Sequence, residues 1–114
     1  MEKIFVQAQL FDFYGEMLNE HQKAVFEDYV LNNIGISEIA QERGISRQSV
    51  HDLIKRCTRT LEEYEEKLHL VEKFEKTKGL IKKVDELIES IPREKDDKLI
   101  KEIKKTLGNI LDEM

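Results

Sequence analysis

The side chains best suited to chemistry lie between residues 47 and 59, where polar and basic types occur together within a sequence of 114 residues. An arginine can form two parallel hydrogen bonds with guanine and a glutamine can do so with adenine, whereas other lysines and arginines suit phosphates. Asp52 is discordant, because its carboxylate repels phosphate unless it pairs with a base, with Lys55 or with Arg56. The candidate nucleic-acid-binding side chains are Arg47, Gln48, Ser49, His51, Lys55, Arg56 and Arg59.

The other reactive side chains form no catalytic or metal-binding pattern. The three histidines are far apart in the sequence and lack a second ligand at metal spacing. The carboxylates of residues 62–66 stand among lysines, without a nucleophile or a glycine-rich loop. These observations predict that the protein is not an enzyme and holds no metal ion or cofactor. The single cysteine, Cys57, is expected to pack as a small hydrophobe, with a reactive thiol beside Arg56 and Arg59 as the alternative.

Charge is distributed unevenly, and the candidate side chains lie in the only positive segment. The net charge is −5 over the whole chain. Residues 1–36 carry two lysines and six acidic residues, and residues 61–114 carry twelve basic and fifteen acidic residues. Residues 37–60 carry five basic and three acidic residues. A small basic segment between acidic flanks argues against nonspecific coating of nucleic acid and favours a limited footprint.

The sequence predicts neither membrane insertion nor export. It contains no apolar run of about 18 residues, the length that a membrane-spanning helix needs. Its first residues carry one lysine and scattered acids, unlike the basic start and apolar centre of a signal peptide. A single cysteine excludes an internal disulfide and fits a reducing compartment. We therefore expect a cytoplasmic protein.

Two short helices joined by a tight turn are predicted around the positive segment. Ser37 is expected to cap a helix over residues 38–43, and Ser46 to cap a second helix. Gly44 supplies the positive backbone angle that the turn between them requires. Small or apolar residues stand at the offsets where these helices must pack, namely Ile39, Ala40, Ile45, Val50, Leu53 and Ile54. This spacing predicts a helix-turn-helix with the candidate side chains on the outer face of its second helix.

Helical spacing also characterises the rest of the chain, and no segment has the pattern of a strand. Helices are expected at about residues 3–17 and 20–31, the second capped by Asn19. The predicted fold is all-α, with a helix-turn-helix domain over residues 1–60. Residues 61–114 form a helical extension, continuous with the recognition helix, that serves packing or dimerisation.

The extension is predicted from a long apolar seam. Apolar residues recur at alternating spacings of four and three from Val50 to Val71, which predicts one helix from residue 47 to the mid-70s. Two more seams follow at residues 80–91 and 99–114, with a break at the proline and charged residues between them. The apolar side chains of these seams must be buried against other helices. Either the last two helices fold back on the long one, or a second copy of the chain packs against them. A symmetric pair would also present two recognition helices to adjacent groove turns, so we predict a homodimer.

A resemblance to known proteins is carried by residues 18–56, "LNEHQKAVFEDYVLNNIGISEIAQERGISRQSVHDLIKR". This stretch resembles region four of bacterial sigma factors, the part that reads a promoter element. The flanking "LFDFYGEML" and "TLEEYEEKLHLVEKF" are similar to the YlxM family of small bacterial proteins. The likeness covers at least residues 8–75, and the stretch after about residue 76 matches less distinctly. His51, where an aromatic residue is common in that family, and Cys57 on the seam are departures that leave the motif intact.

The resemblance implies an all-helical protein with a sigma-like helix-turn-helix. By position, its recognition helix would run from Arg47 to about Arg59, with Arg47, Gln48, His51 and Lys55 as the reading face. It also implies a regulatory part in the signal recognition particle pathway of protein targeting. Three hypotheses stay open: a DNA-binding regulator, an accessory factor that binds the RNA or protein of the particle, and a structural adaptor that keeps the motif as a fold.

Overall fold

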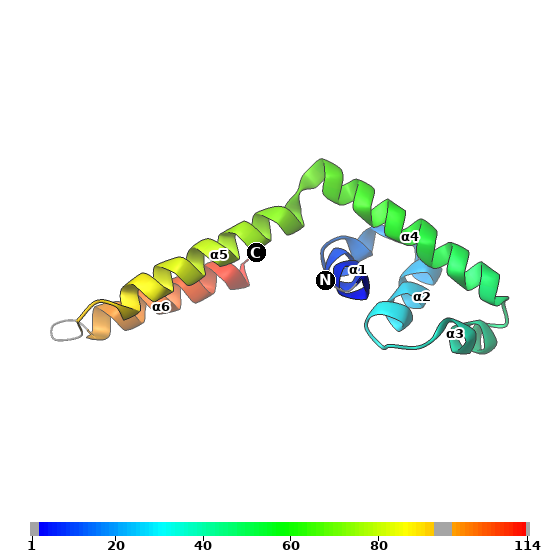
Figure 1. Ribbon diagram of the computed structural model, residues 1–114, viewed down its shortest axis with the longest axis horizontal. Helices are drawn as coiled ribbons and strands as arrows, with labels where there is room; N and C mark the ends of the chain where they lie inside the picture. The colour runs from blue at the N-terminus through cyan, green and yellow to red at the C-terminus, as the bar shows by residue number, and fades with distance from the viewer. Residues whose placement is uncertain (1–2, 93–96, 114) are drawn as a thin grey trace. The chain divides into compact units, whose positions relative to one another are not determined.

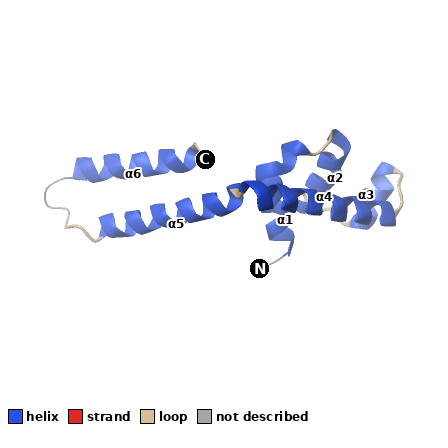
Figure 2. Ribbon diagram, turned by 90° about the horizontal axis from the view of Figure 1, so that it is seen from above, coloured by secondary structure: helices blue, strands red, loops and turns tan. Residues whose placement is uncertain are grey.

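The computed structural model describes residues 3–92 and 97–113 of the chain (Figures 1 and 2). The described residues form six α-helices and one short 3-10 turn, and they contain no strand, which confirms the predicted all-α fold. The chain divides into two compact units, Met1–Val71 and Glu72–Met114. The elements are α1 (Lys3–Tyr14), the 3-10 turn η1 (Gly15–Met17), α2 (Glu20–Val30), α3 (Ile36–Arg43), α4 (Arg47–Leu68), α5 (Leu70–Glu89) and α6 (Asp97–Asp112).

Side-chain hydrogen bonds cap the amino ends of α2 and α4, and a turn at Gly44 joins α3 to α4. At the start of α2, the Asn19 side chain accepts a hydrogen bond from the Gln22 amide at 2.8 Å, and the Gln22 side chain accepts one from the Asn19 amide at 3.2 Å. Gly44 has φ 66° and ψ 34°, the left-handed conformation that the turn requires. Ser46 caps α4 by accepting a bond from the Ser49 amide at 3.0 Å. The helix-turn-helix geometry is therefore present as predicted.

The prediction that Ser37 caps a helix over residues 38–43 is wrong. The helix α3 begins at Ile36, its N-cap is Gly35, and no side chain caps it. The Ile39 amide donates to the Gly35 carbonyl at 3.0 Å. Ile36 is partly buried and packs against the core of the N-terminal unit. Because burial of this side chain favours drawing Ile36 into the helix, the helix starts before Ser37.

The core of the N-terminal unit lies between α4 and the three preceding helices. Helix α4 contacts α1, α2 and α3, so one face of the helix is buried from Val50 to Leu61. The side chains with least exposure are Phe26, Ile39, Leu61, Val25, Val50 and Cys57. Burial raises the pKa of the Cys57 thiol. The thiol therefore stays protonated at neutral pH, and Cys57 packs as the small hydrophobe that its position on the seam predicted.

The prediction of one helix from residue 47 to the mid-70s is also wrong. Helix α4 ends at Leu68, and His69 adopts a left-handed conformation with φ 56° before α5 begins. The first amide groups of α5 are bonded by side chains from elsewhere in the unit: the Leu70 amide donates to the Tyr14 hydroxyl at 3.1 Å. The Val71 amide donates to Glu65 Oε1 at 3.0 Å. Because these bonds satisfy the start of a new helix, the chain can break without a proline.

The Tyr14 hydroxyl is central to this junction, because it also donates to Glu65 Oε1 at 2.5 Å while accepting from Leu70. We expect Tyr14→Phe to lower the free energy of unfolding by about 1 to 3 kcal/mol, since the Leu70 amide and Glu65 each lose a partner. Denaturant titration at neutral pH, followed by circular dichroism, measures this difference.

The pH dependence of the same variant gives a second readout. Burial of the hydroxyl and its hydrogen bond to Glu65 raise the pKa of Tyr14. A raised pKa stabilises the fold fully below the pKa of unfolded tyrosine, about 10. The contribution is lost as the pH rises through the folded pKa. The stability difference between the wild type and Tyr14→Phe should therefore shrink above about pH 10. A difference that stays constant across this range would contradict the assignment.

The C-terminal unit is a hairpin of two antiparallel helices, α6 and the greater part of α5 (Figure 2). Ile88 of α5 and Ile100 of α6 are buried. Lys104 of α6 forms ion pairs with Glu89 and, at 3.7 Å, with Asp85 of α5. The predicted break falls between Glu89 and Asp97, and residues 93–96 of it lie outside the described residues. No helix among those described is long and apolar enough to cross a membrane.

Candidate nucleic-acid interface

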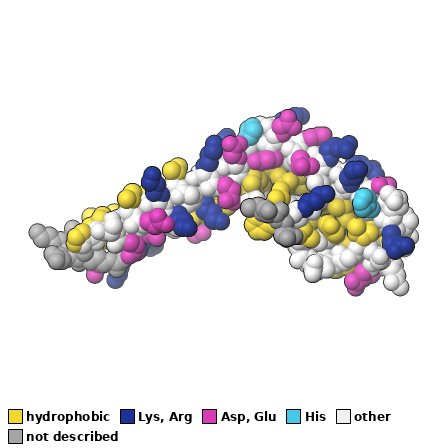
Figure 3. All heavy atoms as spheres, in the orientation of Figure 1, with side chains coloured by type: hydrophobic (Ala, Val, Ile, Leu, Met, Phe, Trp, Pro, Cys, Tyr) yellow, Lys and Arg dark blue, Asp and Glu magenta, His cyan; other side chains and the backbone are white. Residues whose placement is uncertain are grey.

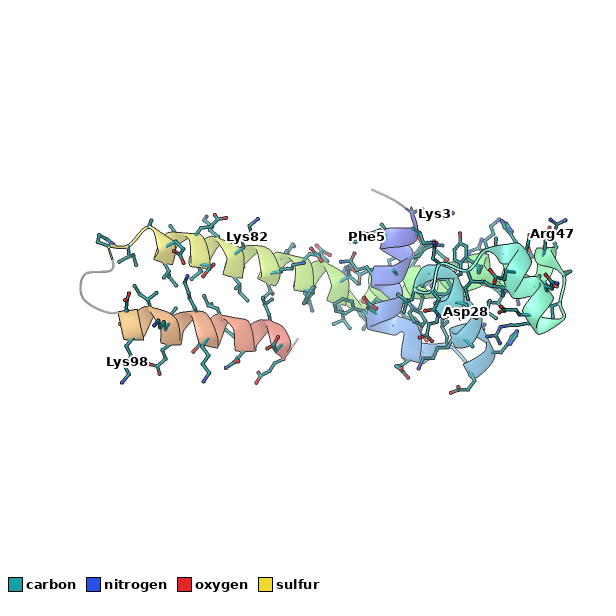
Figure 4. The ribbon with its side chains drawn as sticks, turned by 90° about the horizontal axis from the view of Figure 1, so that it is seen from below. Lys3, Phe5, Asp28, Arg47, Lys82 and Lys98 are labelled. Atoms are coloured by element: carbon teal, nitrogen blue, oxygen red, sulfur yellow. The ribbon has the colours of Figure 1, made fainter. Side chains whose placement is uncertain are left out.

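The seven predicted side chains all lie on the exposed face of α4, opposite the face that the core buries. Val50, Ile54, Cys57 and Leu61 hold the buried face, and their spacing fixes which residues of α4 point outward. Arg47 projects from the first turn of the helix, beside the turn from α3 (Figure 4). In a helix-turn-helix the amino end of the second helix is the part that meets base edges.

A shallow open hollow of about 570 Å³ lies at this amino end. Its walls come from the start of α3, the Ser46 cap and the first turn of α4, so side chains from two helices share one surface. The amino end of a helix also attracts anions, because its first amide groups point outward. The hollow therefore combines an anion-attracting backbone with side chains that can pair with bases. The lining residues are Ile36, Ser46, Arg47, Gln48 and His51.

A second open hollow of about 550 Å³ continues along α4 and shares Ile36 and His51 with the first. It is bounded by α1, α2, the first residue of α3 and α4. A hydrogen bond of 2.9 Å from Gln7 Nε2 to Thr58 Oγ1 holds α1 against α4 at its floor. The residues that it adds are Lys3, Gln7, Tyr29, Ile54, Lys55, Thr58, Arg59 and Glu62.

The two hollows sort the predicted residues into three groups. Arg47 and Gln48 line the hollow at the amino end, and Lys55 and Arg59 line the hollow along the helix, with His51 in both. Ser49 and Arg56 are exposed and line neither hollow; they lie toward the other edge of the outer face. The Ser49 hydroxyl accepts a hydrogen bond from Ser46 Oγ at 2.8 Å, so this side chain belongs to the cap.

Lys3 is a basic residue of this surface that the sequence pattern missed. It belongs to the first turn of α1, on a segment with a net negative charge, and only the packing of α1 on α4 brings it to the groove (Figure 4). Tyr29 of α2 likewise adds an aromatic ring to the wall. No signal in the sequence links either residue with the recognition helix, because each lies on a different helix from it.

Asp52 pairs with Gln48, a partner that the sequence interpretation did not consider. Gln48 Nε2 donates a hydrogen bond to Asp52 Oδ1 at 2.9 Å, and His51 Nδ1 lies 4.0 Å from the same oxygen. A glutamine amide has two N–H donors and a carbonyl oxygen. After this bond one donor and the oxygen remain, which is the combination that adenine accepts. Asp52 can therefore orient the Gln48 amide rather than only repel phosphate.

Within the described residues, no group of three His, Cys, Asp or Glu side chains is placed to hold a metal ion. His51, the exposed histidine of the recognition helix, has Nδ1 at 4.0 Å from Asp52 Oδ1. The exposed side chains of this surface offer hydrogen-bond donors and acceptors and positive charges.

Comparison of the sequence with known proteins shows similarity to a family of bacterial proteins over most of the chain. A family model described as "UPF0122: Putative helix-turn-helix protein, YlxM / p13 like" matches residues 1–106. A UPF0122 protein of Bacillus pumilus (strain SAFR-032) is 42% identical over 106 residues, which is 92% of this chain and 96% of the relative. UPF0122 proteins of Bacillus cereus (strain Q1) and Bacillus anthracis (strain A0248) are each 43% identical over 88 residues, 77% of this chain and 80% of theirs.

Proposed function

Because this chain belongs to the UPF0122 family of YlxM- and p13-like helix-turn-helix proteins, we propose that it is a cytoplasmic, regulatory DNA-binding protein that acts as a homodimer. Membership of the family confirms the resemblance to the YlxM family that the sequence analysis identified. Helix-turn-helix is a binding fold rather than an enzymatic one. The family resemblance also motivates a role of this protein in the signal recognition particle pathway.

One observation carries the proposal: basic and amide side chains at the amino end of α4 line a continuous concave surface while the opposite face of α4 is buried in the core. Arg47 and Gln48 stand where a recognition helix meets base edges. Lys55, Arg59 and Lys3 extend the surface with charges that suit phosphates. The acidic groups on the rest of the chain confine phosphate binding to this region, because they repel DNA elsewhere.

The experiment compares the full-length protein with two double variants on labelled duplex DNA enriched from a random pool. Arg47→Ala with Lys55→Ala removes one base-reading and one phosphate-contacting side chain. We expect affinity to fall about 10- to 100-fold, since a base-pairing arginine contributes about 1 to 3 kcal/mol. The matched control is Lys82→Ala with Lys98→Ala, two exposed basic residues of the C-terminal unit (Figure 4). The control should bind as the wild type does.

The same protein preparations should be tested on RNA, since an accessory factor for the RNA or protein of the particle is the second candidate. The observation that favours this candidate is the Tyr29 ring in the groove, because aromatic side chains stack on unpaired bases. Tight binding of a structured RNA with weak binding of every enriched duplex would favour it over DNA. If Arg47→Ala with Lys55→Ala binds both nucleic acids as well as the wild type does, the proposed surface is wrong.

A further inference from the structure

The C-terminal hairpin carries an exposed apolar face of seven large aliphatic side chains. On α5 and the residues just after it, they recur at spacings of four, three and four, as in a helix that packs against another helix. On α6 the spacing is four and then seven, with Thr106 at the position between. Their exposed fractions range from 38% to 64%. The residues of this face are Leu80, Val84, Leu87, Ile91, Leu99, Ile103 and Ile110.

The hairpin's own packing cannot cover this face, because it uses different positions of the same helices. Ile88 and Ile100 are buried, and Ile81 and Leu107 are partly buried where α5 lies along α6. The ion pairs of Lys104 with α5 close the same side. Consecutive helical residues point about 100° apart, so a helix that contacts α6 through Ile81 directs Leu80 to another side. A row of hydrophobic side chains is visible along one edge of the hairpin in Figure 3.

We propose that a second copy of this chain covers the face, so that two hairpins form a four-helix bundle in which α5 of each copy packs on α6 of the other. The charged residues at the edges of the face favour this pairing over one of α5 on the partner's α5. Helical spacing places Lys76 and Lys83 on the outer edge of α5, with Glu72 beside Lys76, and places Glu102 and Glu113 on the outer edge of α6, with Lys98 one turn before Glu102. Stacking α5 on the partner's α6 sets the basic edge against the acidic edge. Stacking α5 on the partner's α5 would set lysines against lysines, which opposes association.

The register of the hairpin strengthens the charge argument. Lys104 contacts Asp85 and Glu89, which fixes which turns of the antiparallel helices lie level. The two helices are antiparallel, so moving nine residues forward from Lys104 on α6 corresponds to moving about nine residues backward on α5. In that register Glu113 lies level with the turn of α5 that contains Lys76. A twofold axis along the bundle keeps these levels, so Lys76 faces Glu113 of the partner subunit. In the single chain Lys76 lies 3.1 Å from Glu72.

The size of the face agrees with an interface between copies. Seven aliphatic side chains, each about half exposed, present on the order of 600 Å² of apolar surface, at the upper end of the largest patches found on monomers. A standard stable interface buries about 800 Å² on each partner, which the face approaches once its charged edges are included. The 3-4 spacing on α5, which α6 follows with Thr106 at one of its positions, is the arrangement that packs in four-helix bundles.

This inference gives a structure to the homodimer of the proposed function. One consequence, which concerns DNA, rests on the proposed function. With α5 on the partner's α6, both chains enter the bundle at the same end. Two N-terminal units then join the bundle together, so two recognition helices are available to one DNA duplex. The surface itself is tested without DNA, so that a failure of the dimer and a failure of DNA binding can be told apart.

The first test is sedimentation of the full-length chain at tens of micromolar. We expect the wild type to sediment at twice the 13.5 kDa of one chain. A triple variant of the face, Leu80→Gln with Leu87→Gln and Ile103→Gln, should sediment as a monomer. The matched control places three glutamines at equally exposed apolar positions of the N-terminal unit, Phe5, Met17 and Leu31, and should remain a dimer.

A charge exchange decides the arrangement, because unfolding of the hairpin cannot imitate it. Lys76→Glu with Lys83→Glu should weaken the dimer at least tenfold, and adding Glu102→Lys with Glu113→Lys should restore it. A monomeric wild type, a dimeric glutamine variant or a monomeric control would overturn the proposed surface. Failure of the second pair of changes to restore association would overturn the pairing of α5 with the partner's α6.

Discussion

Replacing Phe26 by alanine is expected to lower the free energy of unfolding of the N-terminal unit by about 3 to 5 kcal/mol. Phe26 has no exposed surface, and its ring lies 5.6 Å from that of Phe11, centroid to centroid. Truncation removes this contact and leaves a cavity between α1, α2 and α4 that a rigid core cannot fill. Most of the stability of a small domain would be lost, since such domains are held by about 5 to 15 kcal/mol.

The matched control for this change is Phe5→Ala. Phe5 is the same residue type but is 56% exposed on the first turns of α1 (Figure 4). Its truncation should change the free energy of unfolding by no more than about 0.5 kcal/mol, as is usual on surfaces. Denaturant titration followed by circular dichroism measures both variants. Equal effects of the two truncations would show that Phe26 does not hold the core as described.

Raising the salt concentration from about 50 to about 200 mM is expected to weaken DNA binding about 100-fold for each chain. The reason is the number of basic side chains that suit phosphates, namely Lys3, Lys55, Arg56 and Arg59. About four phosphate contacts give a slope near −3.6 in a plot of log affinity against log salt for one bound chain, and about twice that for a dimer with both recognition helices on the duplex. Fluorescence anisotropy on the enriched duplex, at several salt concentrations, measures this slope.

The salt dependence of single alanine variants measures how much each side chain contributes to the slope. Lys55→Ala and Lys3→Ala should each reduce its magnitude by about 0.9 for every chain bound to the duplex, one phosphate contact per chain. Lys98→Ala, on the C-terminal unit, is the matched control and should leave the slope unchanged. A wild-type slope near zero would exclude phosphate contacts by the groove, and an unchanged slope for Lys3→Ala would remove α1 from the interface.

The helix-turn-helix could be predicted from the sequence because its determinants are local. The left-handed backbone at Gly44 needs only a missing Cβ. The caps at Asn19 and Ser46 each act on an amide three residues away. The buried and exposed faces of α4 follow from helical spacing alone, so the seven candidate side chains were placed on the outer face without knowledge of their neighbours.

Two predictions were wrong, the N-cap of α3 and the length of α4. In both places, residues distant in the sequence determine the backbone. Nothing in residues 60–75 announces the break at His69, because the bonds that permit it come partly from Tyr14, which lies 56 positions before its partner Leu70. The N-cap of α3 is Gly35 and not Ser37, and the helix begins at Ile36 and not at residue 38, because the core of other helices attracts the isoleucine. In both cases the local pattern allowed two outcomes with similar energies, and tertiary contacts selected one.

By itself, the sequence determined the helical class, the family, the turn around Gly44 and the outward face of the recognition helix, since these depend on spacing and on neighbours a few residues apart. Only the tertiary structure decided that Lys3 joins the groove and that Leu80 and its fellow aliphatic residues stay outside the hairpin. Each of these depends on which helices pack together and in what register. Which helices pack together is determined by the burial of whole helix faces, and a short stretch of sequence does not specify it.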